Sequence, residues 1–326
     1  MASIPIPARA PAHPHLRPLN VLRDLSAVAD LIELCFQPNM DSDGQDYVRQ
    51  MRRASRDDSF LRWASQTIEG ASMPMSGFVW EENGRIVGNA SLIPFHHRRK
   101  KIHLIANVAV HPEARRRGIA RALTQECLSQ ARQRKADSVW LHVRDDNPGA
   151  LDLYTRLGFR ERFRRTTWLS AAGPAEPPPG RPAAIVPRAA RFWPQQKEWL
   201  ERAYPGELGW YRLFNWSGFA PGLRYWLYLF FVDMNFRQWA ALKDDRLHAV
   251  LSWTGGGRAD PLWLAAAPDA DPHAVTALLL HARADLSARQ KLVLEHPVGA
   301  LDASIRAAGF DPARTLIWMR ADGATA

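Results

Sequence analysis

The stretch Arg115-Arg116-Arg117-Gly118-Ile119-Ala120 decides the fold. An apolar run, Leu104–Val110, precedes it, and a helical pattern follows it. Backbone N–H groups at a helix N-terminus lack partners and carry a partial positive charge, and glycine lets the backbone come close to an anion. A turn of arginines and glycine between a strand and a helix therefore predicts a cradle for phosphate and a ligand with a pyrophosphate.

A second motif downstream predicts another helix followed by a strand. Asn147-Pro148 is typical of a helix start, because asparagine caps helices and proline suits the first helical position. Gly158 fits the position just past a helix end, and Phe159 begins the next strand. The positions in between that recur at helical spacing are Ala150, Leu153, Tyr154 and Leu157.

Together these features resemble the GNAT superfamily of acetyl-CoA-dependent N-acetyltransferases. The order is apolar strand, R-x-x-G-x-A, helix, strand and N-x-x-A-x-x-x-Y-x-x-x-G-F, over roughly residues 16 to 169. The resemblance implies an α/β (α+β) fold, in which a mixed, strongly twisted sheet is flanked by helices. It also implies that acetyl-CoA is the cosubstrate and that the central strands, after Ile102 and before Arg144, splay apart to admit it.

The resemblance also assigns roles to individual residues. The backbone of Val108, Ala109 and Val110 matches the strand that holds the pantetheine arm and the thioester carbonyl. Asn147 matches a residue near the pantetheine, and Tyr154 matches the tyrosine that protonates the leaving thiolate, to which a phenol with a pKa near ~10 is suited. Each match also has a purely structural alternative. The strand is then simply a buried strand, Asn147 a helix cap, Tyr154 a core tyrosine and the arginine run the basic first turn of a surface helix. The matching pyrophosphate positions are Arg115, Arg116, Arg117, Gly118, Ile119, Ala120 and Arg121.

The general base is the point at which this sequence departs from the family pattern. Some members place a glutamate on the strand before the phosphate turn, but Leu104–Val110 contains no carboxylate. His97, His103 and Asn107 are nearby alternatives, since a histidine titrates near neutral pH and can act through water. Water alone, with the amine arriving partly neutral, is the remaining alternative.

Length and composition limit the number of domains and the kind of ligand that we expect. A chain of 326 residues suits two domains of ordinary size. The net charge of +10 is uneven: residues 1–170 hold 26 Lys and Arg against 18 Asp and Glu, and residues 171–326 hold 17 against 15. This asymmetry is compatible with an anionic ligand such as CoA or with a solvated basic surface. The basic stretch Arg98–Lys101 lacks interleaved aromatic residues, so we expect no nucleic-acid partner.

The two cysteines, Cys35 and Cys127, lie in apolar helical patterns, which predicts buried free thiols and a reducing compartment. No spacing typical of a metal site occurs, so no metal is expected. The N-terminus lacks the apolar core of a signal peptide, and the longest apolar run, Trp226–Val232, is too short to span a bilayer. These features predict a cytoplasmic protein without a membrane partner.

The chain order predicts four parts: a flexible tail over 1–15, a catalytic GNAT domain over 16–170, a Pro-rich linker over 171–182 and a degenerate GNAT-like domain over 183–326. The second domain repeats the first in weakened form. Gly299-Ala300-Leu301-Asp302 repeats Gly149-Ala150-Leu151-Asp152, and Gly309-Phe310 repeats Gly158-Phe159.

The second copy lacks the residues that the resemblance assigns to chemistry. The loop Ala267–Pro272, at the place of the arginine turn, is acidic and would repel a pyrophosphate. Ser304 or Ile305 stands where Tyr154 stands in the first copy, depending on the gap. We therefore expect a catalytically inactive second domain.

The predicted function is transfer of the acetyl group of acetyl-CoA to a primary amine of a small molecule or peptide, by direct attack in a ternary complex. The alternative is a catalytically silent acyl-CoA-binding sensor or scaffold. An aromatic-rich stretch fits either an acceptor pocket or a core. Its members are Trp193, Trp199, Tyr204, Trp210, Tyr211, Phe214, Trp216, Phe219, Tyr225, Trp226 and Tyr228.

Overall fold

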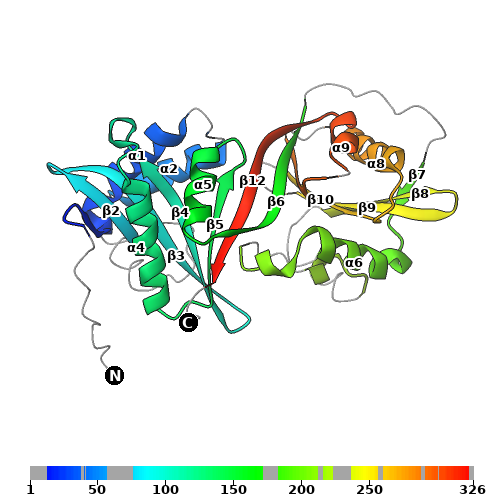
Figure 1. Ribbon diagram of the computed structural model, residues 1–326. Coiled ribbons are helices and arrows are strands. Elements are labelled where there is room, and N and C mark those ends of the chain that lie inside the picture. The colour runs from blue at the N-terminus through cyan, green and yellow to red at the C-terminus, as the bar shows by residue number, and fades with distance from the viewer. Residues whose placement is uncertain are drawn as a thin grey trace. The chain divides into compact units, whose positions relative to one another are not determined.

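The computed structural model forms two compact units, each built of helices and strands (Figure 1). Unit 1 comprises Met1–Arg162 and Trp318–Ala326, and unit 2 comprises Phe163–Ile317. The structure describes residues 13–37, 40, 42–56, 76–171, 183–211, 216–222, 236–255, 260–287, 291–299 and 301–322.

Unit 1 is built around the predicted strand, turn and helix. Its strands follow the order β1-β2-β3-β4-β5-β12, in which β4 and β5 are parallel and the pairs from β1 to β4 are antiparallel. Its elements are β1 (Leu16–Pro18), α1 (Val21–Phe36), α2 (Ser42–Ala54), β2 (Gly77–Glu82), β3 (Arg85–His97), β4 (Lys100–Val110), the 3₁₀ turn η2 (Pro112–Ala114), α4 (Ile119–Gln133), β5 (Ser138–Arg144), α5 (Pro148–Arg156) and the start of β6 (Arg160–Ser170).

Helix α4 packs on the sheet through an apolar face. Ile119, Leu123, Cys127 and Leu128 are all buried. A Cβ atom at Gly88 on β3 would lie 2.8 Å from Cγ2 of Ile119, so glycine lets the helix approach the strand closely. The close packing fixes the N-terminus of α4 relative to the central strands.

From its hairpin onward, unit 2 follows the same order of strands and helices as unit 1, in agreement with the predicted repeat. An antiparallel hairpin leads to a parallel pair, β10 and β11, joined by helix α8, as β4 and β5 are joined by α4. The strand order is β12-β6-β11-β10-β9-β8-β7. The elements are β7 (Ala184–Pro187), η3 (Ala190–Phe192), α6 (Trp193–Ala203), η4 (Gly206–Leu208), η5 (Trp216–Phe219), β8 (Phe236–Lys243), β9 (Arg246–Thr254), β10 (Asp260–Ala266), α8 (Pro272–Asp285), β11 (Leu292–Pro297), α9 (Asp302–Ala307) and β12 (Phe310–Asp322).

Two strands pass from one unit to the other. Strand β6 leaves unit 1 after Arg162, and β12 leaves unit 2 after Ile317, so that the last residues of the chain belong to unit 1. The expected domain boundary in 171–182 stays a prediction. Most of the expected tail and linker, residues 1–12 and 172–182, lies outside the described residues.

The aromatic stretch lies mainly in a core of unit 2. Trp199 and Phe219 are buried together with Trp263, and Trp193, Tyr204 and Trp216 pack against the same cluster. This placement favours the core interpretation for the described members. Phe214, Tyr225, Trp226 and Tyr228 lie outside the described residues. None of the helices in the described ranges is long and apolar enough to cross a membrane.

Candidate functional site

The turn between β4 and α4 presents backbone N–H groups without side-chain cover. Arg116 has φ +65° and Gly118 has φ +79°, and Gly118 is the N-cap of α4 without a side-chain cap. Because the first backbone bond of the helix runs from Ala122 to Gly118, the N–H groups of Ile119, Ala120 and Arg121 have no partner within the helix. A Cβ atom at Gly118 would meet no atom within 4 Å. The geometry is that of an anion-binding turn.

The four arginines of this turn differ in what they contact. Nε of Arg115 donates to the carbonyl of Val110 at 3.2 Å, and Arg117 makes a two-bond ion pair with Glu82 on β2. Arg116 and Arg121 are exposed and make no ion pair within the described part of the chain. Arg117 is therefore the one arginine of the four that an ion pair engages within the described residues.

Strands β4 and β5 separate beside the turn, as the resemblance implies. Their pairing covers Ile102–Leu104 with Ser138–Trp140, whereas β4 continues to Val110 and β5 to Arg144. Beyond the paired rows, Val108 and Val110 are partly exposed and Ala109 is buried. The separation leaves the backbone of β4 beyond Leu104 free of a β5 partner.

A β-bulge lies in the same part of β4. Asn89 pairs with Ala109 and Ser91 pairs with Ala106, so Asn107 and Val108 together oppose Ala90. Asn107 has φ +53°, a left-handed conformation that asparagine tolerates better than most residues.

Helix α5 brings Tyr154 and Asn147 into unit 1. Asn147 is the N-cap of α5, since its side chain accepts from the N–H of Ala150 at 3.1 Å. Tyr154 is buried, with its ring against Phe159 at 6.1 Å between centroids. Burial, and secondarily the nearby Cys127, raises the pKa of the Tyr154 phenol, so the hydroxyl stays protonated at neutral pH.

The histidines considered as bases lie far from Val108. His103 pairs with Pro94 and Val139 near the start of β4, about 17 Å along the strand from Val108 at about 3.3 Å per residue. Burial, with a smaller effect of the Arg134 charge, lowers the pKa of His103 to about 4. His97 pairs with Lys100 at the β3–β4 turn, farther still from Val108. Among the three alternatives, the bulge places only Asn107 beside Val108.

The two thiols differ in their burial. Cys127 is buried, and burial raises the pKa of its thiol. Cys35, on α1, is only half-buried, and its Sγ donates to the carbonyl of Val110 at 3.3 Å. Within the described ranges, no three His, Cys, Asp or Glu side chains are grouped so as to hold a metal ion.

Unit 2 carries the opposite charges at the place of the anion-binding turn. Asp271 caps α8 by accepting from the N–H of His273 at 2.7 Å, and its carboxylate pairs with Lys243. Asp269 pairs with Arg246 at 2.5 Å. The helix N-terminus thus already has a carboxylate, which opposes binding of a second anion. Ile305 lies four residues before Gly309, as Tyr154 lies before Gly158, and is fully buried.

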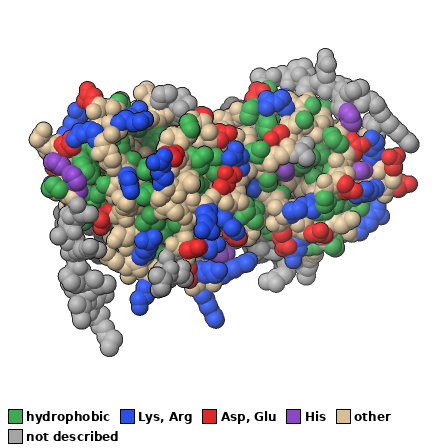
Figure 2. Space-filling model, in the orientation of Figure 1, with side chains coloured by type: hydrophobic (Ala, Val, Ile, Leu, Met, Phe, Trp, Pro, Cys, Tyr) green, Lys and Arg blue, Asp and Glu red, His purple; other side chains and the backbone are tan. Residues whose placement is uncertain are grey.

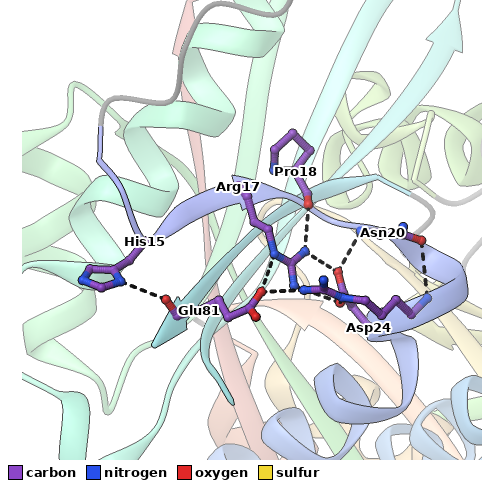
Figure 3. Close-up of polar contacts among 7 residues, drawn as sticks. His15, Arg17, Pro18, Asn20, Asp24 and Glu81 are labelled. Carbon is purple, nitrogen blue, oxygen red and sulfur yellow. Dashed lines mark hydrogen bonds and ion pairs between the residues drawn. The ribbon is translucent and has the colours of Figure 1, made fainter. Parts of the chain in front are cut away.

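A cluster of four charged residues near the N-terminus of α1 joins β1, α1 and β2 (Figure 3). Arg17 donates two bonds to Asp24, at 2.6 and 2.9 Å, and one to Glu81 at 2.5 Å. Arg23 donates to the same two carboxylates at 3.0 and 2.5 Å. A cavity of about 630 Å³ opens at this cluster. Because each carboxylate already has two arginine partners, we interpret the cluster as a structural one that holds β1, α1 and β2 together.

Several known acetyltransferases are similar to this chain. The family model for the acetyltransferase (GNAT) family matches residues 31–159. The chain is 46% identical over 61 residues to a mycothiol acetyltransferase from Tsukamurella paurometabola, covering 19% of this chain and 21% of that protein. It is 40% identical over 62 residues to a ribosomal protein alanine N-acetyltransferase from Escherichia coli, covering 19% of this chain and 42% of that protein.

The chain thus spans only about a fifth and two fifths of the lengths of these two relatives. The solved structure of a GCN5-related N-acetyltransferase from Sphaerobacter thermophilus matches more of it. That match covers 96% of this chain and 98% of the other, with a TM-score of 0.57 at 17% identity, which supports a shared fold. Residues 31–159 of the chain thus match the acetyltransferase (GNAT) family, and the fold of the chain is that of a GCN5-related N-acetyltransferase.

Proposed function

We propose that unit 1 transfers the acetyl group of acetyl-CoA to a primary amine by direct attack in a ternary complex. The observation that carries the proposal is the open turn before α4 beside the separated ends of β4 and β5. Acetyl-CoA supplies an activated thioester when bound. In this proposal Arg116, Arg121 and the first N–H groups of α4 bind its pyrophosphate.

In the proposed reaction the amine nitrogen bonds to the thioester carbonyl carbon, and the C–S bond breaks. The backbone of Val108, Ala109 and Val110 orients the thioester and donates to the developing oxyanion. Tyr154 gives its phenol proton to the leaving thiolate, and the nitrogen loses a proton to water. Since both reactants are held together, much of the acceleration comes from orientation.

The acceptor is proposed as an amine of a small molecule or a peptide. The names of the two relatives described above refer to acceptors of these two kinds, mycothiol and a ribosomal-protein alanine. In this proposal unit 2 binds no CoA, because Asp269 and Asp271 hold the position that phosphate would need.

The test is calorimetric titration of acetyl-CoA into the full chain, followed by turnover with a panel of amines. We expect one binding site per chain and acetyl-CoA consumption that depends on the amine. Failure to bind acetyl-CoA would overturn the transferase proposal. Binding without turnover on any small amine or N-terminal peptide would favour the silent sensor instead.

A further inference from the structure

Four polar side chains surround the bulge in β4 and come from three elements. Nδ2 of Asn89, on β3, donates to the carbonyl of Asn107 at 2.9 Å. Nδ2 of Asn107 donates to the hydroxyl of Tyr47, on α2, at 2.7 Å. Both amides also lie 3.4 Å from Oγ of Ser91. The bulge is thus held by side chains of α2 and β3.

Asn89 is an energetically unfavourable residue for the interior of a strand. Its side chain is fully buried, and its Oδ1 has no hydrogen-bond partner within the described part of the chain. Burying a polar atom without a hydrogen-bond partner destabilises the folded state. An apolar side chain at this position would avoid that cost, so the donation from Nδ2 to Asn107 is the interaction that the amide provides.

The hydrogen bond from Asn89 orients a whole peptide unit and not only the carbonyl that accepts it. The carbonyl of Asn107 and the N–H of Val108 belong to one planar, trans peptide unit, so they point in opposite directions. Since the carbonyl accepts from a side chain of β3, it is turned toward β3. The N–H of Val108 is then turned toward the β5 side, where β4 and β5 no longer pair.

We propose that Asn89 and Asn107 are positioning residues, which aim the N–H of Val108 at the thioester carbonyl oxygen in the gap between β4 and β5. The inference rests on the proposed function. Asn89 holds the peptide plane through the Asn107 carbonyl. Asn107 supplies the left-handed backbone and, through Tyr47, anchors the bulge to α2.

The experiment uses acetyl-CoA labelled with ¹³C at the thioester carbonyl and needs no acceptor. Isotope-edited infrared spectra of the bound ligand report how strongly its carbonyl is polarised. In the wild-type chain we expect the band to move to lower wavenumber on binding. In Asn89→Asp, which keeps the shape but replaces the donor, we expect at least half of that shift to be lost.

Binding and turnover separate a positioning role from a structural one. In Asn89→Asp we expect the acetyl-CoA Kd to change by less than about 3-fold and kcat to fall by at least about 10-fold, since a single oxyanion donor contributes up to about 10²–10³-fold in kcat. The matched control is Asn20→Ala, which removes the N-cap of α1 in the same unit. Asn20→Ala should lower the Tm and leave the band in its wild-type position.

A second variant keeps the proposal testable if Asn89→Asp does not fold. Asn107→Gly retains a backbone that adopts positive φ but removes the bond to Tyr47, and we expect its band to return part of the way toward that of free acetyl-CoA. A wild-type band in folded Asn89→Asp or in Asn107→Gly would overturn the inference. No acetyl-CoA binding by the wild-type chain would instead overturn the proposed function.

Discussion

Arg117 and Glu82 join the turn before α4 to the tip of the β2–β3 hairpin by two hydrogen bonds, of 2.7 and 3.1 Å. In unit 2, Lys243 and Arg246 at the corresponding hairpin pair with Asp271 and Asp269 at the corresponding turn. The same hairpin-to-turn contact is therefore made twice with the charges reversed. Only the turn of unit 1 keeps spare positive charge for an anion.

The first prediction separates the arginines of that turn. Arg116→Ala should weaken acetyl-CoA binding about 10-fold, because a charge-assisted hydrogen bond contributes about 1.5–3 kcal/mol. Arg117→Ala should weaken binding less than about 3-fold, because its guanidinium is engaged by Glu82. Calorimetric Kd values at one salt concentration test the difference. Equal losses in the two variants would show that Arg117 leaves Glu82 to bind the ligand.

The second prediction concerns the glycine of the turn. Gly118→Glu should abolish acetyl-CoA binding, because it places a carboxylate where the pyrophosphate is proposed to lie. The matched control is Gly118→Ala, which carries the same left-handed strain of about 1–2 kcal/mol without the charge. Its affinity should fall much less. Tight binding by Gly118→Glu, measured by calorimetry, would place the phosphate site elsewhere.

The third prediction concerns Tyr154. Tyr154→Phe should lower kcat by about 100-fold and leave the acetyl-CoA Kd nearly unchanged, since proton donation acts only in the chemical step. Because the pKa of the phenol is raised, the wild-type kcat should not fall through pH ~10, where an ordinary tyrosine titrates. Tyr211→Phe, at an exposed tyrosine of unit 2, is the control. Equal kcat in wild type and Tyr154→Phe would remove Tyr154 from the mechanism.

The local signals were enough to predict much of unit 1. Asn83-Gly84 forms the β2–β3 turn with both residues at positive φ, and Asn147 caps α5 as its position before Pro148 indicates. These features depend on neighbours in the chain. The repeat of unit 1 in unit 2 can be predicted for the same reason, because its signals are local. Gly309 follows α9 at φ +74° as Gly158 follows α5 at φ +90°.

The contacts that distinguish one candidate site residue from another are made with parts of the chain that are distant in the sequence. The pairing of Arg117 with Glu82 and of Asn107 with Asn89 requires the register of β2, β3 and β4, which spacing alone does not give. One sequence signal for Asn89 exists, namely a polar residue inside the apolar run of β3. The passage of β12 into unit 1 has no local signal, because it is decided by the pairing of β12 with β5, which lies far from it in the sequence.

The fourth prediction concerns the cluster in Figure 3 and the stability of unit 1. Burial alone would raise the pKa of Asp24, but hydrogen bonds from Arg17, the N–H of Asn20 and Arg23 outweigh it and lower the pKa. A carboxyl whose pKa is lower when folded stabilises the protein above its unfolded pKa, near ~3.9, and loses that contribution as the pH falls through the folded value.

Asp24→Asn should therefore reduce the free energy of unfolding by about 1.5–3 kcal/mol at pH 7 and flatten its dependence on acid pH, because it removes the buried carboxylate that accepts from Arg17 and Arg23. Asp152→Asn, in an exposed pair with Arg156 on α5, should change stability by less than about 0.5 kcal/mol. Urea unfolding of both variants from pH 3 to pH 7 makes the comparison. Equal stability of wild type and Asp24→Asn would contradict the role of the cluster.

The fifth prediction follows from the reversed charges of unit 2. Calorimetry should give one acetyl-CoA site per chain, because the N-terminus of α8 is capped by Asp271 and its carboxylate is held by Lys243. Asp271→Ala removes that carboxylate but supplies neither the glycine nor the arginines of the unit 1 turn, so the stoichiometry should stay at one. Two sites in the wild-type chain would show that the acidic turn accommodates the ligand. A second site that appears only in Asp271→Ala would show that the carboxylate alone blocks unit 2.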